Sequence, residues 1–536
     1  MAILKSQINV GGEGFQTNRA EMLALLDGVR TLERRVVELS AASRRKFQER
    51  GQMLPRERIA YLLDSGSPFL ELSTLAGLGI HDDDGHHNPM GGGIITGMGY
   101  VSGVRCMVIA HDSGIKGGIL MPIGVRKTIR AQEIAQANRL PVVYLVESGG
   151  GNLRYQFEAF SIGGGVFKNQ SRMSAAGIPQ ISVVHGSATA GGAYMPGLSD
   201  YLIMVRNRAK VFLAGPPLLR AATGEVATDE ELGGAELHAM VSGVCDYMVE
   251  DDREGLDCVR RIVAALVWDG KAPHRPYEEP RYSPDELAGV VPVDFRRAYD
   301  VREVIARLVD NSDFHEFKTN IGIATVCGQA NIEGYPVGII GNNGPIDADG
   351  AAKGGQFIQL MCQANSPILY LHNITGFMVG TDAERRGIVK HGSKMIQAVS
   401  NATVPQISLM MGASFGAGNY GMCGRGFDPD FIFAWPNNRT ATMGGEQAAK
   451  VMTIIAEDRA ARDGKTVDRA ALDAAEKKLI AQFEHESTAL YATARMFDDG
   501  IIDPRDTRKV LAFCLATCRE GSRVALNPNT FGVGRL

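Results

Sequence analysis

An internal repeat constrains this chain more than any other feature of its sequence. The segment "PVVYLVESGG" begins at Pro141 and matches "PILYLHNITG", which begins at Pro367. The segment "IPQISVVHGSATAGGAY" begins at Ile178 and matches "VPQISLMMGASFGAGNY", which begins at Val404. Both pairs are separated by 226 residues. Ordered similarity at a fixed spacing indicates that one folding unit occurs twice.

Each copy alternates short β-branched runs, such as "LPVVYLVE" and "PQISVVH", with polar stretches of helical spacing. This alternation is typical of βαβ units around a buried sheet. We therefore predict an α/β protein made of two tandem domains from an internal duplication, 1–290 and 291–536. The segment "RPYEEPRYSPDEL", residues 275–287, is rich in proline and charge and is predicted to be a linker.

A glycine-rich stretch follows a predicted strand in both copies, and the repeat places Gly191 and Gly192 opposite Ala417 and Gly418. The first N–H groups of a helix lack intrahelical partners, and together with the helix dipole they favour negative charge. We predict that each strand-to-helix turn holds one oxyanion on its backbone. The alternative is that the glycines only allow a helix to pack closely against a strand.

Composition excludes several functional classes. The net charge of −4 is too small to indicate nucleic-acid binding, and no apolar run is long enough to span a membrane. The N-terminus lacks a signal-peptide pattern, and the eight cysteines are scattered, which predicts reduced thiols in the cytoplasm. The segment "HDDDGHHN", residues 81–88, is interpreted as a surface loop, so no metal is expected.

Two further groups of side chains could carry chemistry. Arg126, Lys127 and Arg130 are spaced for one helix face, which could bind a phosphate-rich ligand or could simply be solvated. Ser187 and His185 invite a hydrolase interpretation. The stretch lacks the G-x-S-x-G pattern, and two residues on one strand do not face each other, so a serine nucleophile is not predicted.

Long segments of the chain resemble the carboxyltransferase β subunits of biotin-dependent acyl-CoA carboxylases. They include "LPRERIAYLLDSGSPFLEL", "FLAGPPLLRAATGE", "GAGNYGMCGR", "MGGEQAA" and "FDDGIIDPRDTR", and the resemblance covers nearly the whole chain. It implies two crotonase-like domains and a hexameric β6 core, with active sites between the N-terminal domain of one subunit and the C-terminal domain of another. It also implies an acyl-CoA substrate, and biotin carried on a separate α subunit that contains biotin carboxylase and the biotin carboxyl carrier.

The resemblance implies that the N-terminal domain binds acyl-CoA and the C-terminal domain binds biotin. Negative charge then develops in turn on the biotin oxygen and on the thioester oxygen, which would explain two oxyanion turns. The implied contacts are Gly191 and Gly192 with the thioester oxygen, Ala417 and Gly418 with the biotin oxygen, Gly149 and Gly150 at the CoA entry, Arg126 and Lys127 with the CoA phosphates, and Phe377 and Val379 beside biotin.

The motifs also suggest a substrate class. "NITGFMVG" resembles the group that acts on branched 2-enoyl-CoAs, whereas carboxylases of straight short acyl-CoAs usually show "DVPGF". The methylcrotonyl pattern typically reads "DSGGANLPRQ", and this chain has "ESGGGNLRYQ", with Gly151 for alanine and Arg154 for proline. The smaller Gly151 favours geranyl-CoA, or another longer chain, over 3-methylcrotonyl-CoA.

Other functions stay open at this point. The same turns would serve a carboxyltransferase of propionyl- or acetyl-CoA, or a biotin-dependent decarboxylase assembly that runs the transfer in reverse. A crotonase-type hydratase or isomerase would need an acidic residue over the substrate, and Glu147 and Glu158 are available. A scaffold without activity would have no reason to keep glycines in both copies.

Overall fold

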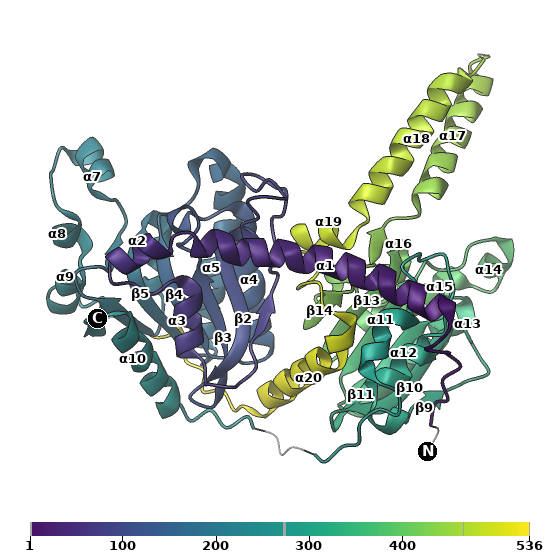
Figure 1. The fold of residues 1–536 in the computed structure, drawn as a ribbon, viewed down its shortest axis with the longest axis horizontal. Coiled ribbons are helices and arrows are strands. Elements are labelled where there is room, and N and C mark those ends of the chain that lie inside the picture. Colours follow the sequence, from purple (N-terminus) through teal and green to yellow (C-terminus); the bar gives the residue numbers. More distant parts are fainter. Residues whose placement is uncertain (1–2, 272–274, 465, 535–536) are drawn as a thin grey trace. The chain divides into compact units, whose positions relative to one another are not determined.

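The computed structural model describes residues 3–271, 275–464 and 466–534, and it divides into two compact units, each built on one sheet (Figure 1). The division differs from two consecutive domains, 1–290 and 291–536, because helices α1 (Glu13–Ala41) and α20 (Thr507–Arg523) each run across a unit boundary. Unit 1 comprises Met1–Arg30, Pro273–Thr493 and Phe497–Ala516, and unit 2 comprises Thr31–Ala272, Ala494–Met496 and Thr517–Leu536.

The segment predicted to be a linker packs into unit 1 along its described part. The N–H of Arg281 donates to Ser312 Oγ at 3.0 Å, and the Arg508 guanidinium lies 5.4 Å from the centre of the Tyr277 ring. Proline and charge therefore mark a surface segment here, and its side chains are held by contacts that a free linker would lack.

The sheet of unit 2 pairs its strands in the order β1-β2-β3-β4-β5-β6-β8, and β7 pairs with β5. Strands β3 to β6 are parallel, and β1 and β2 are added antiparallel at one edge. Residues 142–146 of β4 are all buried, as expected for a parallel strand covered on both faces. The strands are β1 (Leu70–Leu72), β2 (Ile94–Val101), β3 (Val104–His111), β4 (Val142–Ser148), β5 (Gln180–Thr189), β6 (Tyr201–Val205), β7 (Lys210–Phe212) and β8 (Tyr247–Val249).

The sheet of unit 1 repeats this arrangement in the order β14-β13-β12-β11-β10-β9, with β15 pairing with β13. Strands β11 to β14 are parallel, and β9 and β10 are antiparallel at the edge. The strands are β9 (His315–Phe317), β10 (Thr325–Ile332), β11 (Tyr335–Asn342), β12 (Ile368–Ile374), β13 (Gln406–Phe415), β14 (Phe431–Ala434) and β15 (Arg439–Ala441).

Equivalent strands keep equivalent side-chain contacts, which confirms that the repeated segments form matching elements. The hydroxyl of Tyr144 on β4 donates to Gln180 Oε1 on β5 at 2.9 Å. The hydroxyl of Tyr370 on β12 donates to Gln406 Oε1 on β13 at 2.8 Å. Both tyrosines and both glutamines are separated by the sequence period of 226 residues. The predicted α/β fold with one sheet in each copy is confirmed.

Helices cover both sheets. In unit 2, α4 packs on α5 and α3 packs on α10, and in unit 1, α13 packs on α15. The helices of unit 2 are α2 (Arg44–Glu49), α3 (Pro55–Leu62), α4 (Pro122–Ala137), α5 (Gln156–Ala175), α6 (Tyr194–Gly197), α7 (Pro216–Thr223), α8 (Asp229–Gly233), α9 (Ala235–Met240) and α10 (Asp252–Ala265). Those that lie wholly in unit 1 are α11 (Leu287–Val290), α12 (Val301–Leu308), α13 (Ala348–Gln363), α14 (Thr381–Arg385), α15 (Ile388–Ser400), α16 (Gly416–Gly421), α17 (Gly445–Arg462) and α18 (Arg469–Glu486), and α19 (Ala489–Ala494) ends across a unit boundary.

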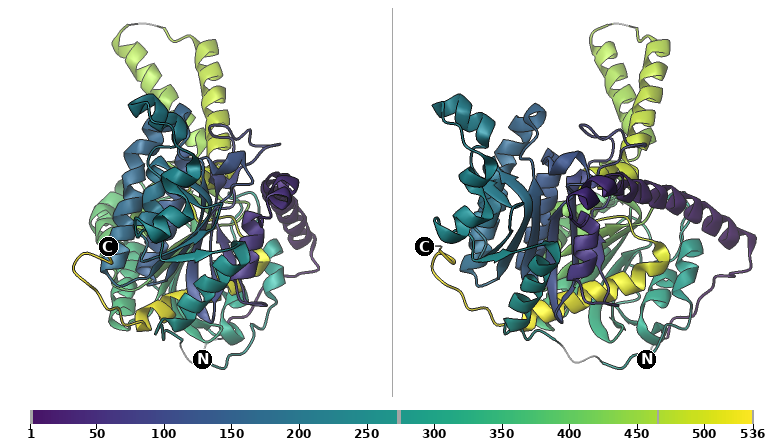
Figure 2. Two further views of the ribbon diagram at one scale, coloured as in Figure 1. Left: turned by 90° about the vertical axis from the view of Figure 1, so that its left-hand side faces the viewer. Right: turned by 60° about the vertical axis from the view of Figure 1, so that its left-hand side comes forward.

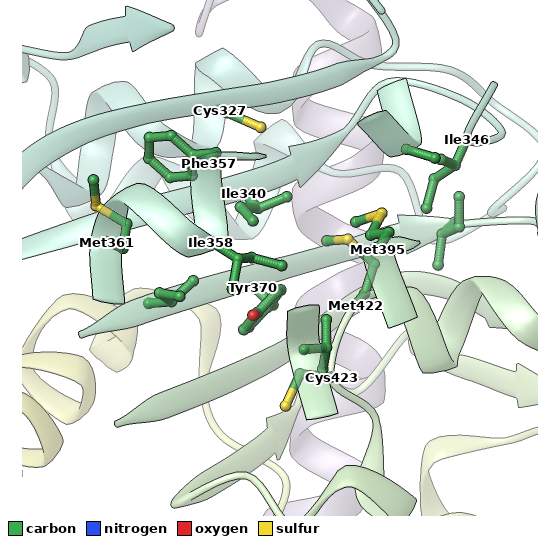
Figure 3. Close-up of a cluster of buried hydrophobic side chains, with 14 of the residues drawn as sticks. Cys327, Ile340, Ile346, Phe357, Ile358, Met361, Tyr370, Met395, Met422 and Cys423 are labelled. Carbon is green, nitrogen blue, oxygen red and sulfur yellow. The ribbon is translucent and has the colours of Figure 1, made fainter. Parts of the chain in front are cut away.

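Helices α17 and α18 form a pair that extends away from the sheet of unit 1 (Figures 1 and 2). The core of that unit lies between the sheet and helices α13 and α15. Figure 3 shows Phe357, Ile358 and Met361 of α13 beside Tyr370 of β12, with Met395 of α15 in the same buried cluster. This packing holds the carboxyl ends of β12 and β13, where the second glycine turn begins.

The buried Asp498 in unit 1 predicts a pH-dependent stability. Burial raises its pKa to about 7, although Thr493 Oγ1 at 2.6 Å and the N–H of Gly500 at 3.0 Å donate to its Oδ1. A raised carboxyl pKa stabilises the folded state below pH ~4, and this contribution is lost as pH rises to about 7, in total about 4 kcal/mol. We expect Asp498→Asn to remove this fall in the free energy of unfolding between pH 4 and 8, measured by denaturant titration. A variant with the wild-type pH profile would contradict this account.

Candidate active site

The first glycine turn leaves its backbone open. Strand β5 continues through the "GSAT" part of the stretch to Thr189, and a 3₁₀ turn, Ala190–Ala193, then leads into α6. A Cβ placed on Gly191 would meet no atom within 4 Å, and one placed on Gly192 would meet only Ser148 Oγ, at 4.0 Å. The sequence interpretation that the stretch is a strand-to-helix turn is confirmed, with the turn beginning at Ala190. A ligand atom can approach these two residues closely.

The second turn has the same path and a different environment. Gly416, the equivalent of Ala190, shares its left-handed backbone, with φ values of 52° and 54°. Ala417 is exposed, whereas Gly418 is buried, and a Cβ on Gly418 would lie 2.5 Å from Ile374 Cγ1 and 3.0 Å from Gly376 Cα. The alternative of close packing therefore explains the missing side chain of Gly418, and it does not explain Gly191 or Gly192.

The loops that follow β4 and β12 are also equivalent. The N–H of Leu120 donates to Gly150 O at 2.9 Å, and the N–H of Ile346 donates to Gly376 O at 3.1 Å. Gly150 has a φ of 88°, and its N–H donates to Ser148 Oγ at 3.1 Å, so both of its backbone groups are used internally. Gly149 is exposed and is the member of this predicted pair that a ligand can reach.

The two residues predicted to lie beside biotin face different surroundings. Phe377 is partly buried, packs against Ala348, Ala383 and Ile388, and would touch a Cβ on Gly421 at 3.0 Å. Val379 is 88% exposed. Phe377 therefore supports the turn from beneath, and Val379 is free to contact a ligand. The repeat places Phe377 opposite Gly151, where an added Cβ would meet no atom within 4 Å.

The predicted basic face on α4 does not form. Arg126 is exposed, whereas Lys127 is 2% exposed and donates to Gly91 O at 3.1 Å, and Arg130 is also buried. Burial lowers the pKa of Lys127 to about 8. The equivalent Lys353 donates to Ile321 O at 3.2 Å, so this lysine position supports the fold in both copies. Lys127 is therefore unavailable to a CoA phosphate. The sequence contained a sign of this, because Arg126 and Lys127 are adjacent in a helix and their side chains point about 100° apart.

A buried charged cluster under the first turn was missed by the sequence interpretation. Arg58 Nη1 donates to Glu147 Oε2 at 2.6 Å, and Arg58 Nε donates to Asp252 Oδ2 at 3.1 Å. Asp252 Oδ1 lies 2.9 Å from Nδ1 of the buried His185, and Ser113 Oγ donates to Glu147 Oε2 at 2.9 Å. These contacts join elements that are far apart in sequence, and only the conspicuous "LPRERI" motif pointed toward Arg58.

The cluster decides the protonation state of its carboxyl groups. Burial alone would raise the pKa of Glu147, but the Arg58 charge and hydrogen bond outweigh it and hold that pKa below its ordinary value. The pKa of Asp252 is also held well below its ordinary value, because contacts with His185 and Arg58 outweigh its burial. Glu147 is therefore a paired carboxylate, which disfavours it as the proton donor of a hydratase. The exposed Glu158 contacts His81 Nε2 at 3.1 Å.

A serine nucleophile finds no support in the arrangement. His185 is fully buried, burial lowers its pKa, and its Nδ1 is bound to Asp252. Its Nε2 has no hydrogen-bond partner among the residues that the structure describes, Ser187 included. The pair that sequence proximity suggested therefore does not form.

The "HDDDGHHN" segment is a loop stabilised by its own carboxylates. Asp83 accepts from the N–H groups of Gly79, Gly85 and Met90, and Asp84 accepts from those of residues 86–88. Within the described ranges, no cluster of three or more metal-ligating side chains of the histidine, cysteine or acidic type occurs. Over the same ranges, no helix has the length and apolar character needed to cross a membrane.

Comparison with known proteins identifies relatives of this chain. The carboxyl transferase domain model matches residues 46–532. A probable biotin-dependent acyl-coenzyme A carboxylase β2 subunit of Mycobacterium tuberculosis is 50% identical over 494 residues, which cover 92% of each chain. The mitochondrial methylcrotonoyl-CoA carboxylase β chain of Dictyostelium discoideum is 49% identical over 492 residues, covering 90% of this chain and 82% of that one.

A solved structure is similar over the full length. The β subunit of geranyl-CoA carboxylase from P. aeruginosa superposes with a TM-score of 0.94 at 54% identity, covering 100% of both chains. The domain model, the sequence relatives and the solved structure all indicate the same family. The chain therefore belongs to the carboxyl transferase family, among the β subunits of biotin-dependent acyl-CoA carboxylases.

Proposed function

We propose that this chain transfers a carboxyl group from biotin, carried on a partner α subunit, to the acyl group of a branched 2-enoyl-CoA. The duplicated strand-to-helix turn carries the proposal, since each copy offers backbone N–H groups at one turn. In this assignment, Gly191 and Gly192 hold the thioester oxygen, and Ala417 and Gly418 hold the biotin oxygen. The two sheets support a crotonase-like fold for both copies.

The chemistry asks little of side chains. Bound biotin supplies the carboxyl group and the basic nitrogen, so this chain needs no catalytic base of its own. Its backbone donors bind each reactant by an oxygen and stabilise that oxygen as negative charge develops. A donor of this kind is worth about 3–4 kcal/mol of transition-state stabilisation. The pairing of Glu147 with Arg58 is consistent with this, because it disfavours the nearby carboxylate as an acid–base group.

The acyl-CoA side keeps two of the predicted contacts beyond the turn itself, those of Gly149 and Arg126. Gly149 is exposed at the loop after β4, and Gly150 shapes that loop through its positive φ. The exposed Arg126 is the residue on α4 that remains for a CoA phosphate. A single arginine suits a surface phosphate contact, because its planar guanidinium donates two parallel hydrogen bonds.

The residues of the biotin side fit the group that the proposal places there. A cavity of about 600 Å³ reaches Thr375 and Phe415, which directly precede Gly376 and Gly416. Phe295, Ile480 and Phe483 contribute apolar walls to it. The apolar chain that tethers biotin would be stabilised by burial against such walls, at about 0.8 kcal/mol for each methylene.

One pair of equivalent residues, Gly151 and Phe377, supports a long acyl group as the substrate. Phe377 fills the space beneath the second turn, whereas its equivalent in the first copy is Gly151, with open space around it. We propose geranyl-CoA as the preferred substrate over 3-methylcrotonyl-CoA. The relatives named after both substrates support this class, and the paired roles of the two turns support carboxyl transfer over hydration.

The partners follow from the same family. We propose that the chain assembles as a β6 core and works with an α subunit that carries biotin carboxylase and biotin. The eight cysteines are present as thiols and seven of them are buried, which supports a reducing compartment such as the cytoplasm. Light scattering of the purified chain would test the β6 core by its mass.

A substrate panel tests the proposal. The chain is combined with the matching biotinylated α subunit, ATP and bicarbonate, and carboxylation of geranyl-, 3-methylcrotonyl-, propionyl- and acetyl-CoA is measured. We expect the branched 2-enoyl-CoAs to react and the chain alone to be inactive. Hydration of the same substrates without biotin, or carboxylation by the chain alone, would refute the proposal. A higher kcat/KM for propionyl-CoA would refute the substrate class.

Gly151→Phe is expected to reverse the preference for acyl length. The new ring would occupy the space that Phe377 fills in the other copy, and it would exclude methylenes worth about 0.8 kcal/mol each. The ratio of kcat/KM for geranyl-CoA to that for 3-methylcrotonyl-CoA should fall about 10-fold or more. Gly426→Phe is the control, because Gly426 also has open space but lies in unit 1. An unchanged ratio would show that Gly151 does not contact the acyl group.

A further inference from the structure

We infer that Arg58, through Glu147 and Asp252, is a positioning residue for the acyl-CoA turn. The inference rests on the proposed function, in which Gly191 and Gly192 bind the thioester oxygen. It gives a role to the "LPRERI" motif, which contains Arg58 and lies outside both turns. The residues act through the strands that carry the turn, and they do not touch the substrate themselves.

Arg58 joins three elements of unit 2 at one point. It lies on α3, pairs with Glu147 at the end of β4 at 2.6 Å, and pairs with Asp252 at the start of α10 at 3.1 Å. Asp252 in turn holds the ring of His185 on β5 at 2.9 Å. The side chains of Arg58, Asp252 and His185 are at most 2% exposed. Interactions among charges removed from water are strong and directional.

The cluster lies near the carboxyl ends of β4 and β5, and β5 leads directly into the turn. Glu147 directly precedes Ser148, whose hydroxyl is the atom nearest to the space above Gly192. A Cβ on Gly186 would lie 2.7 Å from Glu147 Cγ, so the Glu147 side chain crosses β5 four residues before the turn, which begins at Ala190. Gln52 Nε2, just before α3, donates to His185 O at 3.0 Å. A shift of Arg58 would therefore move β4 and β5 relative to each other.

The second copy shows that the fold does not require this cluster. The repeat places Asn373 opposite Glu147 and Met411 opposite His185, and both of these residues are uncharged. Asn373 Oδ1 would lie 2.6 Å from a Cβ on Gly412, just as Glu147 crosses Gly186. The same strands and turn thus form over neutral residues. The charges are specific to the copy that we assign to acyl-CoA, which favours a role in that site.

Arg58→Lys is the main test, made in the complete assembly with the biotinylated α subunit. Lysine keeps the charge but cannot bind two carboxylates in the fixed geometry of a guanidinium. Displacement of a binding group by about 1 Å can cost about 100-fold in rate. We expect kcat/KM for the acyl-CoA to fall about 10- to 100-fold in correctly folded enzyme. The KM for free biotin, measured in the reverse transfer from the carboxylated acyl-CoA, should stay within about twofold of wild type.

Arg105→Lys is the matched control. Arg105 pairs with Glu520 at 2.8 Å, with 4% and 18% of the two side chains exposed, but it lies at the opposite end of β3 from the turn. It should lower the melting temperature of the assembly without changing either kinetic constant by more than about twofold. Glu147→Gln is the second variant, since it removes one charge and keeps both the side-chain shape and the Arg58–Asp252 pair. It should lower kcat/KM for acyl-CoA by about 10-fold or more.

Three outcomes decide the inference. Selective loss on the acyl-CoA side in Arg58→Lys and Glu147→Gln supports it. Equal loss on both sides, or the same loss in Arg105→Lys, overturns it and leaves the cluster a purely structural feature. If Arg58→Lys does not assemble, full acyl-CoA activity in Glu147→Gln overturns it. Failure of the proposed function itself would be seen separately, as absence of carboxylation by the wild-type assembly.

Discussion

Gly418→Val is expected to reduce carboxyl transfer by about 100-fold or more. A Cβ at this position would approach Ile374 Cγ1 to 2.5 Å and Gly376 Cα to 3.0 Å, so the second turn must move away from β12. The backbone donors that we assign to the biotin oxygen would move with it, and loss of one such donor costs about 100- to 1000-fold in kcat. The measurement is kcat in the complete assembly and the KM for free biotin in the reverse reaction.

Gly426→Val serves as the control for that substitution. Gly426 lies eight residues later, is exposed, and has no atom within 4 Å of an added Cβ. It should keep activity within about twofold of wild type, since surface changes away from packed features have small effects. Carboxyl transfer at the wild-type rate by a folded, assembled Gly418→Val protein would refute the biotin-side assignment.

Gly192→Val is expected to have a comparable effect on rate for a different reason. An added Cβ meets only Ser148 Oγ at 4.0 Å, so the fold should tolerate the change. The branched side chain would instead occupy the open space above the turn and keep the thioester oxygen from the backbone donors. We expect kcat/KM for acyl-CoA to fall about 100-fold, and the melting temperature to change by no more than a few degrees.

Gly192→Ala is the graded control, because its methyl group covers less of the turn, and it should lose less activity than Gly192→Val. The KM for free biotin should stay unchanged in both variants. A raised KM for free biotin with normal acyl-CoA kinetics would mean that the two copies have exchanged roles. Equal stability of the variant and the wild-type protein would confirm that Gly192 is not needed for packing.

The repeat allowed the fold to be predicted well. The spacing of 226 residues recurs in β4 and β12, in β5 and β13, and in the hydrogen bonds of Tyr144 and Tyr370. The exact bounds of the two units could not be predicted, because α1 and α20 each contribute residues to both units. No local sequence pattern shows where a terminal helix packs.

The two turns show how similar sequence can hide different packing. Gly192 and Gly418 occupy equivalent places, yet Ser148 leaves space above the first turn and Ile374 fills the space beside the second. The larger residue at 374 was visible in the sequence. The distance between it and Gly418 was not, since it depends on how β12 and β13 align near their ends.

The charged cluster could not be predicted because its members are distant in sequence. Arg58 and Asp252 are 194 residues apart, and Arg58 and Glu147 are 89 apart. Lys127 is a different case. Its burial follows from the helical phase of α4, where Arg126 faces solvent and its neighbour cannot.

The covalent duplication has a consequence for how the protein is made. Each translated polypeptide carries one copy of the first turn and one copy of the second, so synthesis itself sets a one-to-one ratio of the two turns. Separate chains would need matched expression to reach the same balance. The residues beneath the turns have diverged, with Glu147 in one half and Asn373 in the other. A substitution that disables one turn is therefore not compensated by the other turn of the same chain.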